Sequence, residues 1–196
     1  MTSRFRYRSG DTNDIFVPYD ADHPIEEGDL VFLDPTLGYA RTATDMTNQG
    51  DDALNQLAFA EYFAGVAMQK AGLQSNEKSF RLVTDPNPPC IRLATSGLFE
   101  FDCAAGMGDT MAEGDLVGIY ATGSGISDSQ KVMAAQTDGA LTRSRAIGFL
   151  RKQPATYGQS SPNETRCFVE VDASLARGGV GTVSSVAGTY TNASGQ

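Results

Sequence analysis

The pentapeptide Glu-Gly-Asp-Leu-Val occupies residues 27–31 of this chain and recurs at residues 113–117. Both copies predict a tight turn that leads into a strand, because Gly readily adopts a positive φ, Asp hydrogen-bonds its own backbone in turns, and an apolar run follows. Residues 30–33 are apolar throughout, so we expect a central strand that is buried on both faces. The chain is therefore expected to contain the same turn-and-strand unit twice.

Three further matches surround the two pentapeptides in the same order. An aromatic strand precedes each pentapeptide, and a glycine-centred strand and a cysteine-led strand follow it. The matched segments are 15–17 with 98–100, 64–66 with 147–149, and 90–93 with 167–170. Matches that keep one order along the chain indicate an internal repeat. We predict two related β units, residues 11–96 and residues 97–177, that share one core.

Alternating polarity along two segments supports strands with one wet face. Residues 98–103 place apolar side chains at the odd positions and acidic ones at two of the three even positions, and residues 167–171 alternate in the same way. A short helix is expected at about residues 51–62, because Asp51 is a plausible N-cap and helical spacing follows it. The predicted fold is all-β, a β-barrel or β-sandwich of short strands with at most one short helix.

The two ends of the chain differ from its middle. Residues 1–10 hold three arginines that alternate with aromatic residues and hold no acid, whereas residues 178–196 hold no charged residue. A tail of this composition cannot bury enough apolar surface to order itself in isolation. We predict an extended N-terminal arm over 1–10 and an extended C-terminal tail over 178–196, both held by a partner. The predicted contact residues are Arg4, Phe5, Arg6, Tyr7 and Arg8 of the arm and Val180, Val183, Val186 and Tyr190 of the tail.

The charge balance argues against nucleic-acid binding. The formal net charge is −9, whereas neutralising phosphates needs clustered Lys and Arg. The arginines of the arm could touch phosphates while its aromatics stack on bases, but contact with an acidic protein surface is the favoured interpretation. The chain start lacks the apolar core of a signal peptide, and the sequence holds no apolar run long enough for a membrane span. Neither a nucleic acid nor a membrane is therefore expected as a partner.

Histidine and cysteine offer little for catalysis or metal binding. His23 is the single histidine, and it lies in a polar turn, where we expect a solvated loop residue rather than a member of a catalytic triad. Cys90, Cys103 and Cys167 are widely spaced, and one His with scattered Cys cannot supply a transition-metal site. We predict that the three cysteines are buried small residues and that the protein has no metal and no cofactor.

Carboxylates leave two possibilities open. Asp20 with Asp22, or Asp51 with Asp52, could bind calcium through oxygen ligands, but neither segment matches the spacing of an EF-hand loop. A pair of carboxylates for glycoside hydrolysis depends on a three-dimensional separation that the sequence does not give. The repeated Glu-Gly-Asp segments are accounted for by turn formation, so we predict that the protein is not an enzyme.

Several short segments resemble small head proteins of tailed bacteriophages. They are residues 58–69, 95–104, 114–118, 146–150, 167–171 and 178–180. The similarity is to capsid decoration, or cement, proteins and spans about residues 26–180. It implies a β-barrel or β-sandwich module that binds the outside of the assembled major capsid protein lattice, often as a trimer, and performs no reaction.

This resemblance sets the functional expectations. We expect a homotrimer on the capsid exterior of a virion, assembled in the host cytoplasm, with the major capsid protein as its partner. The alternative is a glycan-binding β module of a phage fibre or adhesin. Such a module usually displays aromatic platforms, and 9% aromatic residues with no Trp make it the weaker interpretation.

Overall fold

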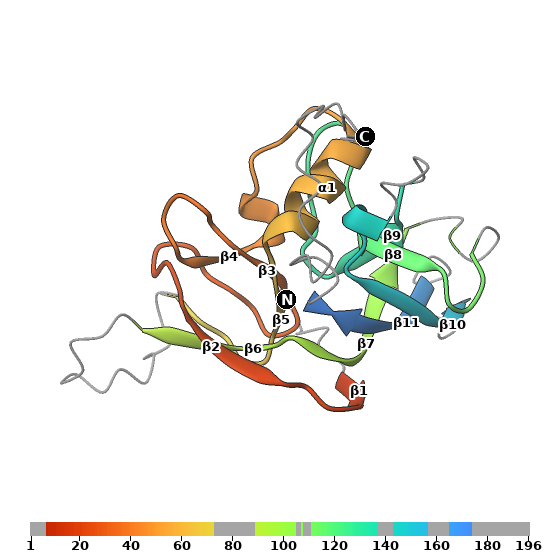
Figure 1. Ribbon diagram of the computed structural model, residues 1–196, viewed down its shortest axis with the longest axis horizontal. Helices are drawn as coiled ribbons and strands as arrows, with labels where there is room; N and C mark the ends of the chain where they lie inside the picture. The colour runs from red at the N-terminus through yellow and green to blue at the C-terminus, as the bar shows by residue number, and fades with distance from the viewer. Residues whose placement is uncertain are drawn as a thin grey trace, which may run out of the picture.

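The computed structural model describes residues 7–72, 89–104, 107, 111–136, 143–156 and 165–173, with the backbone alone for 152–156 and 165. These residues are mainly β, which confirms the predicted fold class (Figure 1). The elements are β1 (Tyr7–Ser9), β2 (Asp14–Pro18), β3 (Leu30–Leu33), β4 (Ala40–Thr42), the 3-10 turn η1 (Ala43–Asp45), α1 (Asp52–Tyr62), β5 (Phe63–Ala67), β6 (Cys90–Ala94), β7 (Ser96–Cys103), β8 (Leu116–Ile119), β9 (Lys131–Ala134), β10 (Gly148–Thr156) and β11 (Thr165–Asp172).

The strands form two sheets of matching topology. One sheet has the order β2-β6-β5-β3-β4 and the other has the order β1-β7-β11-β10-β8-β9. Each sheet closes on itself through a parallel contact: Tyr19, just after β2, bridges Ala40 of β4, and β7 pairs with β9. We call the β2–β6 sheet barrel 1 and the β7–β11 sheet barrel 2. Their strand orders are identical, with β1 added to barrel 2.

The registers make the two barrels equivalent around a central glycine. β3 pairs with β5 at Gly65, and β8 pairs with β10 at Gly148. A Cβ atom on Gly65 would lie 2.4 Å from the carbonyl oxygen of Ala94, and one on Gly148 would lie 2.2 Å from that of Glu170. Such a close approach of backbone to backbone requires glycine. The glycine-centred strands that match in sequence therefore occupy equivalent places in the fold.

β2 and β7 occupy equivalent places in the two barrels, but their residues correspond with a shift of one position from the sequence match. Asp14 and Leu98 stand opposite equivalent residues of β6 and β11, so Phe16 corresponds to Glu100, whereas the sequence match paired Phe16 with Phe99. Phe16 is 69% exposed and Phe99 is 1% exposed. β6 and β11 are also shifted by one residue, but in the opposite direction along the chain. The face that a side chain occupies, rather than its aromatic character, sets the register.

The core joins the two barrels. Leu30 and Phe32 of β3 belong to a cluster with residues of both barrels, while Val31 belongs to a second cluster inside barrel 1. The predicted burial of this strand on both faces is thus confirmed, although Leu33 is only partly buried. The predicted inward faces of β7 and β11 are confirmed as well. Their buried apolar side chains are Phe99, Phe101, Cys103, Cys167, Val169 and Val171.

The predicted short helix is present as α1, which runs directly into β5. Its N-cap is Asp51, whose side chain accepts hydrogen bonds from the N–H groups of Ala53 and Leu54. This carboxylate satisfies two of the N–H groups that a helix start leaves without partners inside the helix. The Asp51 carboxylate therefore caps the helix, and Asp52 lies in its first turn.

A buried glutamine ties α1 to barrel 2. Figure 1 shows α1 beside β8 and β9. The side-chain amide of Gln56 donates to the carbonyls of Ile119 and Ala134, at 3.0 and 3.1 Å, and its oxygen accepts from the N–H of Gln136 at 2.8 Å. A Cβ atom on Gly118 would lie 2.7 Å from the Gln56 nitrogen, so this glycine provides the space. A fully satisfied buried polar side chain fixes one arrangement of the two barrels.

Candidate functional site

The N-terminal arm enters barrel 2 as an added strand. β1 pairs antiparallel with β7, with Tyr7 opposite Phe99 and Ser9 opposite Leu98. The Tyr7 and Phe99 ring centroids are 5.7 Å apart, while 38% of Tyr7 stays exposed. Gly10 follows with a φ of 101°, a conformation that favours glycine. Residues 7–9 of the predicted extended arm are therefore part of the six-stranded sheet.

Arg8 fastens this strand to the outer face of barrel 2. Its guanidinium forms an ion pair with the Glu100 carboxylate and lies 5.5 Å from the centre of the Phe168 ring. The Glu100 side chain is 2% exposed, and Arg166 approaches its other oxygen at 3.5 Å. A carboxylate covered to this extent is stable only with cationic partners. The sequence pattern placed Glu100 on a wet face, which is wrong because Arg8 and Arg166 cover it.

The structure thus places two of the predicted contact residues side by side at the base of the arm. Tyr7 packs on Phe99, and Arg8 binds Glu100, yet 41% of the Arg8 side chain remains exposed. The other predicted contact residues lie outside the described part of the chain. They are Arg4, Phe5, Arg6, Val180, Val183, Val186 and Tyr190.

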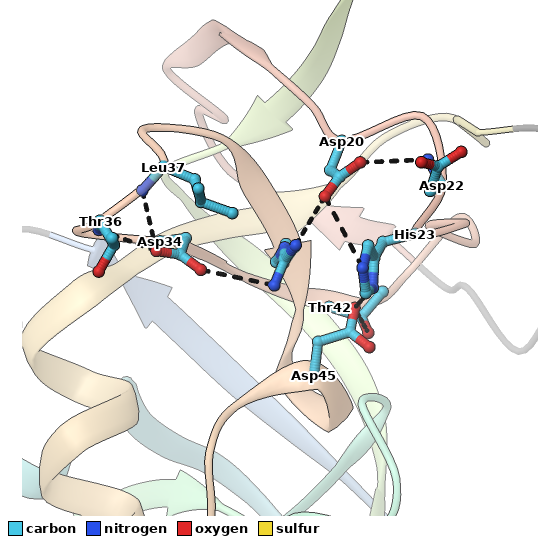
Figure 2. A network of polar contacts seen from close by, with 9 residues as sticks. Asp20, Asp22, His23, Asp34, Thr36, Leu37, Thr42 and Asp45 are labelled. Carbon is cyan, nitrogen blue, oxygen red and sulfur yellow. Dashed lines mark hydrogen bonds and ion pairs between the residues drawn. The ribbon is translucent and has the colours of Figure 1, made fainter.

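A polar network covers one end of barrel 1 (Figure 2). Nδ1 of His23 lies 3.2 Å from the Asp45 carboxylate, and Nε2 lies 3.7 Å from the Asp20 carboxylate. Since both ring nitrogens face a carboxylate, neither is positioned to take a proton from a serine or cysteine nucleophile. The expectation of a solvated loop histidine needs correction, because only 35% of the side chain is exposed and both nitrogens are engaged.

Arg41 of β4 neutralises the acidic residues of the same network. It donates to Asp20 at 2.7 Å and approaches Asp34 at 3.5 Å. The hydrogen bond from Arg41 holds the pKa of Asp20 below its ordinary value, and the same bond raises the pKa of Arg41. The N–H of Asp22 also donates to Asp20. Among the described residues, no group of three or more ligating side chains is arranged to hold a metal ion.

The two copies of the pentapeptide differ in what covers them. Oδ1 of Asp29 accepts from the Ser129 hydroxyl at 2.7 Å and from the Gln130 amide at 3.0 Å, and Oδ2 accepts from the N–H of Glu26 at 2.8 Å. Burial raises the pKa of the Asp29 carboxyl despite these hydrogen bonds. The equivalent Asp115 makes the same turn hydrogen bond but is exposed. A segment of barrel 2 therefore covers the turn of barrel 1, while its own turn stays open.

The cysteines are not equivalent. Cys103 and Cys167 are buried, as predicted, whereas Cys90 is exposed. The alternation along β6 turns Ile91 and Leu93 inward, so Cys90 faces outward and the prediction of its burial is wrong. A hydrogen bond with Cys103, together with burial, raises the pKa of the Cys167 thiol. A thiol that stays protonated is neither a nucleophile nor a metal ligand.

Among the described residues, the large apolar side chains that are exposed all lie in the first half of the chain. Phe16 on β2 is 69% exposed, Leu54 on α1 is 48% exposed, and Leu37 and Tyr39 in the turn before β4 are 49% and 37% exposed. Single exposed apolar residues are common on soluble proteins. Phe16 differs because it projects from β2, which lies at the end of the strand order of barrel 1.

The chain matches no protein-family model and no curated protein sequence. Within the described ranges, no helix has the length and apolar character needed to cross a bilayer. The arm at barrel 2 and the exposed strand of barrel 1 are the features that suit contact with another molecule.

Proposed function

We propose that the chain is a capsid decoration protein that binds the outer surface of an assembled tailed-phage shell and stabilises the head. The observation that carries the proposal is the arm, which is held at its base by β1 and by the Arg8–Glu100 ion pair. The residues predicted to contact a partner, Arg4, Phe5 and Arg6, directly precede this strand. A contact that begins at an ordered anchor costs less conformational entropy than one made by a free tether.

The body behind the arm supports a reinforcing role. One core cluster contains side chains of both barrels, and Gln56 bridges α1 to barrel 2. Closed barrels with a common core form a rigid block, because packed interiors deform little. A rigid block that bridges neighbouring subunits resists their separation, and repeated placement on a symmetric shell turns modest contacts into tight retention.

The resemblance to phage head proteins falls largely on segments that build the fold. Residues 95–104 contain β7, residues 167–171 lie within β11, and residues 58–69 contain the end of α1 and all of β5. The similarity therefore lies in the framework of the barrels, and it supports the proposal through the fold. In the proposal the partner is the major capsid protein, the working form is a homotrimer on the capsid exterior of a virion assembled in the host cytoplasm, and no reaction is performed.

Co-sedimentation with expanded, undecorated shells of the phage concerned tests the proposal. We expect the full-length protein to pellet with the shells and to saturate at a few copies per capsomer. A variant with Arg4→Ala and Arg6→Ala should bind less tightly, because both cations contact the shell. The matched control carries Lys70→Ala and Arg151→Ala, which removes the same charge from exposed ion pairs and should bind like the parent protein.

Two results would contradict the proposal. Failure to pellet with shells, together with retention on a glycan array, would favour the glycan-binding alternative, for which the exposed ring of Phe16 is the nearest candidate platform. An equal loss of binding in both charge variants would show that general electrostatic attraction, rather than the arm, holds the protein to the shell.

A further inference from the structure

The two barrels differ at one equivalent strand edge. Other strands pair along this edge in barrel 2, whereas in barrel 1 no described strand pairs with part of it. In barrel 2, the edge of β7 that faces away from β11 receives β1 along its first half and β9 at its end. In barrel 1, the equivalent edge of β2 is bridged by Ala40 at Tyr19. No described strand pairs with this edge at residues 14–16. The position that β1 fills on barrel 2 is therefore not filled by any described strand on barrel 1.

The backbone of the open edge is arranged to accept a strand. The N–H of Tyr19 donates to the carbonyl of Pro89, on the β6 side. Every second residue of an antiparallel strand faces the same neighbour, so Val17 also faces β6. Asp14 and Phe16 therefore direct their N–H and C=O groups toward the open edge. Such a row of free backbone groups is a template for an added strand.

The outward side chains next to the two edges differ in chemistry. On barrel 2, Glu100 and Phe168 stand opposite each other, and Arg8 of the added strand contacts both. On barrel 1, the equivalent pair is Phe16 and Arg92. An arginine-bearing strand finds Phe16 where barrel 2 offers Glu100, whereas an uncharged strand can pack apolar side chains on the exposed Phe16 ring and stack an aromatic ring on the Arg92 guanidinium.

The charge at this edge is already balanced within the chain. Arg92 forms an ion pair with Asp14, so a visiting strand needs no acidic residue to neutralise it. The basic arm of another copy suits this edge less, because Asp14 is already paired with Arg92 and leaves no free carboxylate there for an arginine. The best-suited occupant is uncharged, extended and rich in residues that favour strands.

We propose that residues 182–190 of a second copy of the chain add to the open edge of β2 as a strand. This segment, Thr-Val-Ser-Ser-Val-Ala-Gly-Thr-Tyr, is uncharged and contains β-branched residues and a tyrosine. The described chain ends at Ala173, whose N–H donates to the carbonyl of Thr95. The eight residues from 174 to 181 can span about 28 Å when extended, far enough to reach a neighbouring molecule.

No described strand of the chain pairs with this edge at residues 14–16, and Phe16 is 69% exposed. We assign the added strand to a second copy, whereas addition of the chain's own tail would leave the protein monomeric. The contact joins a tail to a different surface, so it is heterologous, and a ring of copies closes when every tail occupies the edge of its neighbour. This assembly concerns the free protein and does not depend on binding to a capsid.

The solution mass of the full-length protein and the exchange rate of the Phe16 amide test the proposal together. We expect an oligomer in which exchange at the Phe16 N–H is slowed at least tenfold relative to a variant with Val183→Pro and Ser184→Pro. Two consecutive prolines are used because one of two successive N–H groups faces the neighbouring strand in any register. The proline variant should be a monomer, and the matched Val183→Ala, Ser184→Ala variant should remain an oligomer.

A substitution on the edge itself provides the second arm of the test. Phe16→Asp should yield a folded monomer, whereas Leu54→Asp, at a side chain on α1 that is 48% exposed, should keep the parent mass. The proline variant, altered only in the tail, decides the case if Phe16→Asp fails to fold. A parent protein that is monomeric, a proline variant that stays oligomeric, or a Phe16 amide that exchanges freely in the oligomer would overturn the proposal.

Discussion

Barrel 1 and barrel 2 share a strand order, a Gly-Asp turn and a central glycine, yet they differ in which of their equivalent surfaces are covered by other segments. Asp29 of barrel 1 lies under Ser129 and Gln130, whereas the equivalent Asp115 is exposed. Conversely, β1 pairs with the β7 edge of barrel 2, whereas no described strand pairs with the β2 edge of barrel 1 at residues 14–16. The repeat sets the framework, and the connecting segments decide which equivalent surfaces are covered and which remain for partners.

The largest expected effect concerns the two central glycines. Gly65→Ala and Gly148→Ala should each reduce the free energy of unfolding by roughly 3 kcal/mol or more, because the new Cβ atom would collide with a carbonyl oxygen of the adjacent strand. Gly114→Ala is the control: its φ is 96°, but nothing lies within 4 Å of the new atom, so it should cost about 1–2 kcal/mol. Urea unfolding measures all three variants. A Gly114→Ala cost as large as the other two would contradict the collision as the cause, and clearly different costs for Gly65→Ala and Gly148→Ala would contradict their equivalence.

The contact between α1 and barrel 2 should produce the next largest effect. Gln56→Ala removes two donors and one acceptor from a fully buried site, and we expect a loss of about 2–3 kcal/mol. Glu61→Ala, at an exposed position of α1, should change stability by less than about 0.5 kcal/mol. Denaturant unfolding followed by two probes checks this prediction, and a neutral Gln56→Ala would mean that the barrels are not joined there.

The filled edge of barrel 2 should show a smaller effect. Arg8→Ala leaves the buried Glu100 carboxylate with Arg166 as its remaining cation, and since 41% of the Arg8 side chain is exposed we expect a cost of only about 1 kcal/mol. Amide exchange at Ser9 should accelerate as β1 loosens. Arg151→Ala, in an ion pair exposed on both sides, serves as the control and should leave β1 unchanged.

The covered turn of barrel 1 should show the smallest effect and a characteristic pH dependence. Asp29→Asn should reduce the free energy of unfolding by about 0.5–1 kcal/mol, because one of the carboxylate's hydrogen bonds is lost. Asp115→Asn should reduce it by less. Burial raises the pKa of Asp29 above its ordinary value of 3.8, so the folded state binds more protons than the unfolded state between these two values. The stability of the parent relative to Asp29→Asn should therefore be greatest near pH 3.8 and below, and should fall as the pH rises through the raised pKa.

Thermal or urea unfolding of the parent and Asp29→Asn between pH 3 and pH 7 measures this dependence. A stability difference that grows as the pH rises would contradict the assignment, since it would require a carboxyl group whose pKa is lowered by folding.

Local chemistry in the sequence predicted much of the framework. Asp51 marked the start of α1, and the apolar run at 30–33 predicted the two-sided burial of β3, because capping and hydrophobic periodicity depend on neighbouring residues. The sequence did not predict which face of β2 each side chain occupies, or which residues cover Glu100. Phe16 and Phe99 are both aromatic but lie on opposite faces, and Glu100 is covered by Arg8, a residue 92 positions away. Contacts at such distances are set by the assembled barrels.

The central claim, that the protein coats an assembled shell, is tested most directly by the number of chains that an expanded shell takes up at saturation. Purified shells are mixed with increasing amounts of full-length protein, and the mass of each shell is measured after unbound chains are removed. The account predicts a plateau at a fixed small number of chains per capsomer. Uptake that never saturates, or shells whose mass does not change, would contradict it.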